Sequence, residues 1–144
     1  MQLRETIEAA DDRAWAATTN EGWPAGVTAH HAIGHLALAH FAHAIAAGER
    51  SPFADFTIDA INQGNAMHAA EFAKVTRDET LRQLLSDGPG AVSAVRGMSN
   101  ADLAKTAKMA FAGGAELSAR QVVEGPLLGD LATHLENVRS AVRA

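Results

Sequence analysis

Apolar residues recur at steps of three and four along most of the chain, a spacing that is typical of amphipathic helices. Alternating apolar and polar runs, which would indicate strands, are nearly absent. The pattern predicts helices over residues 2–19, 24–47, 57–74, from 76 onward, from 99 onward and over 118–143.

The ends of several of these helices are marked by residues that start or stop helices. Thr76 with Glu79 resembles a capping box, and Ser118 with Gln121 forms a second one. Gly48 should end the helix that begins near Pro24. We expect Gly88-Pro89-Gly90 to kink or break a helix, and residues 112–117, with two consecutive glycines, to form a loop.

The length and composition fit one domain. The chain has 144 residues, of which 47% are hydrophobic, and roughly a fifth are alanine, the best helix former. No repeat or low-complexity linker divides residues 1–144. The expected fold is therefore a single all-α domain, with a bundle of four long helices as the default architecture.

Charge and residue usage exclude several classes of function. The net charge of −5 argues against nucleic acid as a partner, because phosphate backbones require a basic face. No apolar run reaches the roughly 18 residues of a membrane span and no signal peptide opens the chain, so we expect a soluble, cytoplasmic protein. The chain contains no cysteine, so any thiol chemistry would need a thiol from a small molecule.

Histidines are concentrated in the predicted helix 24–47, and their spacing sorts them onto different faces. His31 and His35 share the main apolar stripe, which predicts that both face the core. His40 and His43 point roughly the opposite way and His30 lies at the edge, so we interpret these three as surface or interface residues. The far side also carries Ile33 and Leu36, a second apolar face that could be a dimer contact.

The last predicted helix carries a carboxylate and an imidazole one turn apart. Asp130 and His134 share a face and could hold one metal ion together. With His31 from the facing helix they would give three ligands and leave positions for water or substrate, as in catalytic zinc sites. Zinc is the first choice, although nickel, iron or manganese also suit this ligand set.

Each of these residues also has a simpler interpretation. Inward-facing histidines are commonly hydrogen-bonded core residues, and an Asp-xxx-His pair is often only a contact between successive turns. His35 can be a core residue or a support for a ligand, and His68 can approach the same cavity as ligand, supporting residue or acid/base. Trp23 can pack at the start of its helix or lie at a cavity mouth.

Two segments resemble a known family. Trp23-Pro-Ala-Gly-Val-Thr-Ala-His-His31 and Ser118-Ala-Arg-Gln-Val-Val-Glu-Gly-Pro-Leu-Leu-Gly-Asp130-Leu-Ala-Thr-His134-Leu resemble motifs of the DinB-like superfamily, which includes the N-terminal domain of mycothiol-dependent maleylpyruvate isomerase. The resemblance implies an antiparallel four-helix bundle with crossover connections, often dimeric. It also implies His31, Asp130 and His134 as ligands of a divalent metal.

The resemblance suggests an enzyme, a thiol-dependent transferase or isomerase. A low-molecular-weight thiol such as mycothiol would be the cofactor, a small electrophile the substrate, His35 or His68 the residue that moves a proton, and Trp23 a contact of the cofactor. The alternatives are a non-catalytic, dimeric helical bundle with core histidines, related to stress, and a metal-binding or sensor protein without turnover.

Overall fold

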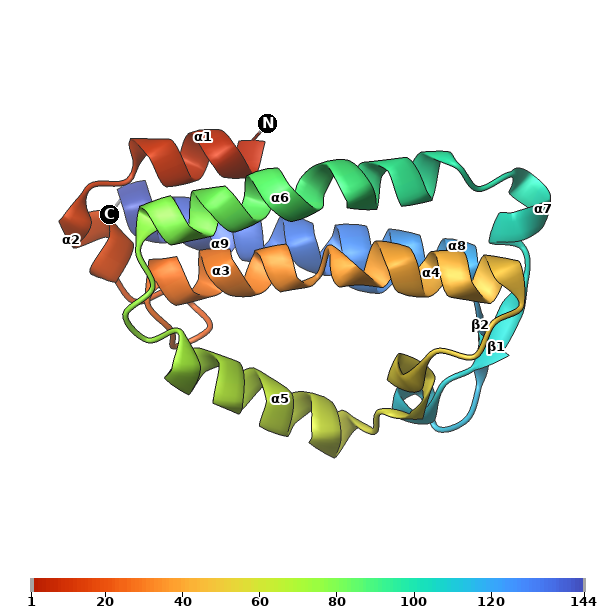
Figure 1. The fold of residues 1–144 in the computed structure, drawn as a ribbon. Coiled ribbons are helices and arrows are strands. Elements are labelled where there is room, and N and C mark those ends of the chain that lie inside the picture. Colours follow the sequence, from red (N-terminus) through yellow and green to blue (C-terminus); the bar gives the residue numbers. More distant parts are fainter. Residues whose placement is uncertain (1, 144) are drawn as a thin grey trace.

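The computed structural model describes residues 2–143, and the chain within them is mostly helical, as predicted (Figure 1). The first predicted helix is divided into α1 (Gln2–Ala9) and α2 (Asp12–Ala16). The division occurs because the Asp11 side chain accepts a hydrogen bond from the backbone N–H of Ala14 and so caps a new helix. The expectation of one helix over residues 2–19 is therefore wrong.

The histidine-rich segment consists of α3 (Ala25–Gly34) and α4 (Ala37–Ala47), which follow one another in nearly the same direction (Figure 1). Between them the backbone N–H groups of His35 and Leu36 bond to carbonyls three residues earlier, so the chain tightens for one turn. Gly48 adopts the left-handed conformation that ends α4, and this end was predicted.

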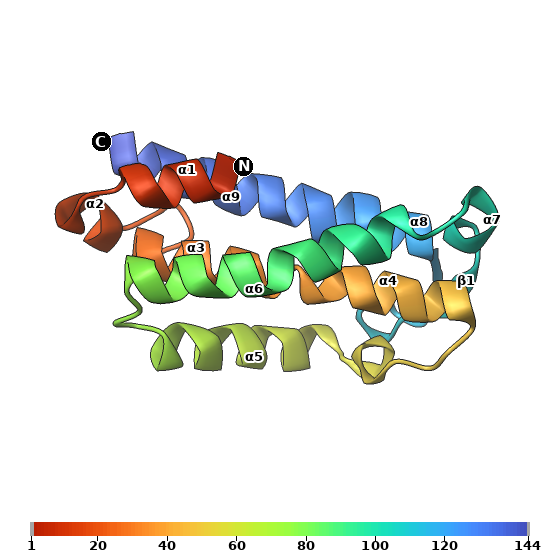
Figure 2. The ribbon, with the colours of Figure 1, turned by 45° about the horizontal axis from the view of Figure 1, so that its top comes forward.

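The next helices are α5 (Ile58–Glu71) and α6 (Arg77–Arg96), with a short 3-10 helix, η1 (Pro52–Asp55), before them. The capping box of Thr76 and Glu79 is confirmed. Pro89 does not break α6, which continues through it and changes direction along its length (Figure 2). No residue of α5 is fully buried. α5 contacts α3, and Figure 1 shows α3 and α4 between α5 and α6.

A small hairpin, which the sequence did not predict, follows the one-turn helix α7 (Asn100–Leu103). Its strands are β1 (Thr106–Lys108) and β2 (Glu116–Ser118), which pair antiparallel with Ala107 opposite Leu117. Strands of three residues are too short to show an alternating pattern. The expected loop at 112–117 is correct only for the turn, where the 3-10 helix η2 (Ala110–Ala112) leads into Gly113 and Gly114, both with positive φ.

The last helical segment contains an irregularity. It runs as α8 (Ala119–Val122), a π-helical segment, η3 (Val123–Gly129), and α9 (Asp130–Arg143). The capping box at Ser118 is confirmed. Pro126 lies inside the π-helical segment; because proline has no N–H and its ring clashes with the carbonyl four residues earlier, regular α-helical bonding cannot continue through it.

The core lies along α3 and α4. α3 contacts α9 and α6, while α4 contacts α6 and α8. Ile33 is 1% exposed and belongs to the apolar cluster that α3 shares with α1 and α9, and half-buried Leu36 packs against it. The second apolar face of this helix is therefore covered within the chain, and it gives no argument for a dimer. Within residues 2–143, no helix combines the length and apolarity needed to cross a membrane.

Candidate metal centre

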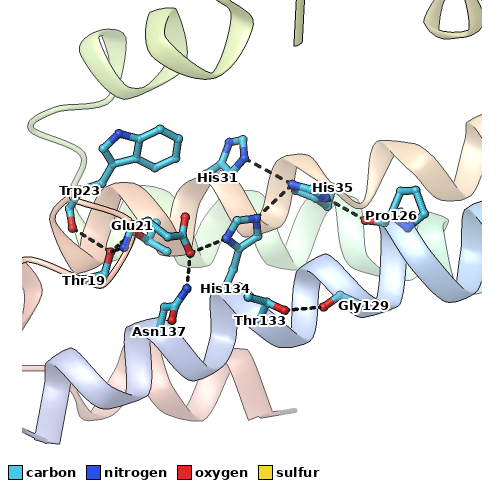
Figure 3. Close-up of polar contacts among 11 residues, drawn as sticks. Thr19, Glu21, Trp23, His31, His35, Pro126, Gly129, Thr133, His134 and Asn137 are labelled. Atoms are coloured by element: carbon cyan, nitrogen blue, oxygen red, sulfur yellow. Dashed lines mark hydrogen bonds and ion pairs between the residues drawn. The ribbon is translucent and has the colours of Figure 1, made fainter. Parts of the chain in front are cut away.

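Three imidazoles meet between α3 and α9 (Figure 3). His31 lies in the last turn of α3, His35 directly follows that helix, and His134 comes from the second turn of α9. The Nε2 atom of His35 is 3.3 Å from Nε2 of His31 and 3.3 Å from Nε2 of His134. One ligand atom from each of the three rings lies within 4.8 Å of the other two. Two segments about a hundred residues apart thus supply one compact group of nitrogen donors.

The outer nitrogens of two rings are held by fixed acceptors. Nδ1 of His35 is 3.0 Å from the carbonyl oxygen of Pro126, in the π-helical segment. Nδ1 of His134 is 2.7 Å from Oε1 of Glu21, which also accepts a bond of 2.7 Å from the Asn137 amide. Carbonyl and carboxylate oxygens only accept, so both Nδ1 atoms carry the proton. In the neutral rings, the Nε2 lone pairs of His35 and His134 therefore face each other.

This donor set fits a metal ion. Tetrahedral coordination at a Zn–N distance of about 2.0–2.1 Å places neighbouring ligand nitrogens about 3.3–3.4 Å apart, and Nε2 of His35 is 3.3 Å from Nε2 of both His31 and His134. When the rings of His35 and His134 are neutral, both protons are on Nδ1, so no proton lies between their Nε2 atoms; His31 can still donate an Nε2 proton to His35. A cation at this point would relieve the repulsion of the lone pairs. Outer acceptors that fix the ligand tautomer are a usual feature of zinc-binding histidines.

The surroundings of His31 and His35 favour their neutral forms. Burial, together with the neighbouring imidazoles, lowers the pKa of His31 to about 3. Burial also lowers the pKa of His35, although the bond to the Pro126 carbonyl and the charge of Asp130 oppose the shift. Neutral imidazole is the form that binds metal, so these two rings are ready to act as ligands near pH 7.

A cavity of about 760 Å³ opens beside the three histidines. Trp23 lines it, with its ring edge-on to His31 at a centroid distance of 5.2 Å. This supports the interpretation of Trp23 as a cavity residue. Asp130 also lines the cavity, but it is exposed and lies outside the three-histidine group. The group contains His35 in addition to His31 and His134, and metal binding by Asp130 stays a prediction.

His30 and His68 form a second pair beside the cavity. Nδ1 of His30 is 3.1 Å from Nε2 of His68, and the His30 ring stacks on Phe72 at 3.9 Å. His30 is 5% exposed, so its interpretation as a surface residue is wrong; the face of α3 that carries it is covered by α5 and α6. His68 lines the cavity, as expected, with its ring centroid 5.1 Å from that of His31. His40 and His43 are exposed, as predicted.

Sequence reasoning missed three residues that position the ligands: Glu21, Pro126 and Asn137. Glu21 lies 113 residues from His134, in a turn, and no local spacing connects them. Pro126 acts through its carbonyl group, which no residue pattern identifies. Only a proline inside an otherwise helical pattern signals an irregularity there.

Comparisons of the chain with protein-family models, curated proteins and solved structures found no match. The site is therefore interpreted from its own geometry.

Proposed function

We propose that this chain binds one divalent metal ion, zinc in the first instance, through Nε2 of His31, His35 and His134. The observation that carries the proposal is the 3.3 Å approach of His35 Nε2 to His134 Nε2 while both Nδ1 protons are donated elsewhere. Three imidazoles with a cavity beside them are also the ligand arrangement of catalytic rather than structural zinc.

We further propose that the domain is a DinB-like antiparallel four-helix bundle with crossover connections. The helices α3–α4, α5, α6 and α8–α9 would be its four long members. The sequence resemblance at Trp23–His31 and Ser118–Leu135 supports this assignment, as does the junction of those two segments at the metal centre. A homodimer is part of the same proposal and rests on the resemblance; sedimentation of the purified protein tests it.

The proposed activity is transfer or isomerisation of a small electrophile with a thiol as nucleophile. A bound divalent metal would act as a Lewis acid and lower the pKa of a coordinated thiol or water. The chain itself has no cysteine, so the thiol would be a small molecule such as mycothiol.

The protein residues would orient the ligands and handle the proton. Glu21 and the Pro126 carbonyl hold the rings of His134 and His35. His35 takes part in holding the metal, so the role of moving a proton passes to His68, which lines the cavity and whose Nε2 is bonded to His30. Trp23 would contact the thiol at the side of His31.

Zinc and cobalt titrations of chelator-treated, untagged protein test metal binding. We expect one site per chain and, with Co²⁺, an absorption spectrum of tetrahedral coordination. His134→Ala and His35→Ala should each abolish the site, whereas His43→Ala, at an exposed histidine outside the cavity, should bind as the wild type does. Wild-type protein that binds no metal would overturn the proposal.

Transfer assays test the activity separately. Zinc-loaded protein is mixed with mycothiol, bacillithiol or glutathione and a chromophoric electrophile. We expect turnover that is lost in His134→Ala and reduced in His68→Gln. Metal binding without turnover for every thiol would leave a metal-binding or sensor protein.

A further inference from the structure

The cavity beside the three histidines has two different walls. At one end Trp23 lies against His31. At the other, Leu38, Phe41 and Phe53 line the cavity, with the two phenylalanine rings 4.8 Å apart. Gly34 and Ala37 lie between these walls, and a Cβ at Gly34 would meet no atom within 4 Å. There is thus open space next to His35 that leads to a hydrocarbon and aromatic wall.

Within residues 2–143, the cavity is lined by acidic side chains but by no lysine or arginine. The ionisable carboxylates that line it are Glu21 and Asp130. Among the described residues that line it, none is lysine or arginine. The remaining polar groups are the hydroxyl and amide side chains of Ser51, Asn65 and Thr133 and five histidines, two of which, His40 and His68, lie outside the three-histidine group. An anionic group on the part of a ligand that lies away from the metal would be desolvated without a lysine or arginine partner, which costs free energy.

From these two observations we propose that the site selects a neutral small molecule with an aromatic body and rejects anionic ones. The donor atom of this molecule binds the metal held by the three imidazoles, while its aromatic ring lies against Leu38, Phe41 and Phe53. The volume of about 760 Å³ is in the range that encloses a drug-sized molecule. This inference deepens the proposed function and rests on metal binding at the three histidines.

The test uses three hydroxamates that present the same head group to zinc-loaded protein. Acetohydroxamate lacks a ring, benzohydroxamate has a neutral ring, and 4-carboxybenzohydroxamate has an anionic one. Calorimetry gives each dissociation constant. We expect benzohydroxamate to bind about tenfold tighter than acetohydroxamate, because its ring is buried. The carboxylate analogue should bind several-fold more weakly than benzohydroxamate.

Two variants, Phe53→Ala and Asn65→Lys, test whether the residues that line the cavity cause the preference for a neutral aromatic ligand. Phe53→Ala should remove the advantage of the ring and leave the affinity for acetohydroxamate unchanged, while Phe56→Ala, in the same segment but outside the cavity lining, should change neither. Asn65→Lys places a cation on α5 at a half-buried position that lines the cavity, on a helix that has no fully buried residue. It should improve the binding of 4-carboxybenzohydroxamate about fivefold, the equivalent of one exposed ion pair.

The outcomes separate the two proposals. Protein that binds no zinc overturns both. Protein that binds zinc but takes all three hydroxamates equally, or prefers the carboxylate analogue before Asn65 is replaced, overturns this inference alone.

Discussion

Glu21 is expected to control zinc affinity although it does not belong to the three-histidine group. Its Oε1 accepts bonds of 2.7 Å from Nδ1 of His134 and from the Asn137 amide, and the side chains of Glu21 and His134 are only 21% and 14% exposed. The negative charge strengthens the His134 bond and makes Nε2 a better donor to metal. The substitution Glu21→Gln keeps the length and an acceptor but removes the charge.

The size of the effect follows from the kind of bond that is lost. A charge-assisted hydrogen bond contributes about 1.5–3 kcal/mol and is roughly twice as strong as a neutral one. Glu21→Gln should therefore cost about 1–1.5 kcal/mol of zinc binding, which corresponds to an affinity roughly five- to tenfold weaker. Glu21→Ala removes the acceptor altogether and should weaken binding about 10- to 100-fold.

Competition with a chromophoric chelator at pH 7.5 measures these affinities. Glu136→Gln on α9 is the matched control, because Glu136 is exposed and lies two residues after His134 without contacting its ring. We expect the control to bind zinc as the wild type does. A Glu21→Gln protein whose zinc affinity stays within twofold of the wild type would refute the role assigned to this carboxylate.

Two further predictions concern stability. The zinc-free protein should lose free energy of unfolding as the pH falls from about 6.5 toward 3, because the pKa of His31 is about 3 in the folded chain and about 6.5 in the unfolded one, which therefore binds more protons in this range. Urea titrations at several pH values measure this, and an unchanged midpoint across that range would contradict it. Gly26→Ala should destabilise the fold by about 1–3 kcal/mol, because its Cβ would collide with the Trp15 indole, whose Nε1 donates to the Val75 carbonyl. Gly64→Ala, at a helical position with open space, should instead stabilise by about 0.5–1 kcal/mol; a shift of the same sign for both variants would show that the collision does not matter.

Features of the fold that depend on local chemistry could be predicted from the sequence. Thr76 with Glu79 and Ser118 with Gln121 start helices, and Gly48 ends one, because each acts on backbone groups within a turn. The hairpin of β1 and β2 depends on pairing across a turn and shows no pattern of its own.

The three-histidine group that could hold a metal was predicted in part. His31 and His134 were selected by their faces on two helices, and the structure brings them together. Helical spacing also placed His35 on the inner face, but only the turn between α3 and α4 and the carbonyl of Pro126 show that its Nε2 points at the other two rings. Residues that support ligands from distant loops, such as Glu21, leave no periodic signal.

The absence of buried residues in α5 has a consequence for the motions of the protein. A helix of 14 residues is barely stable in water by itself, and α5 adds only half-buried contacts with α3 to its own hydrogen bonds. Its amide hydrogens should therefore exchange with solvent well before those of α3, through local opening rather than unfolding of the whole chain. Because α5 carries Asn65 and His68, each opening of α5 would remove one side of the cavity. Molecules too large to enter the closed cavity could then reach the three histidines.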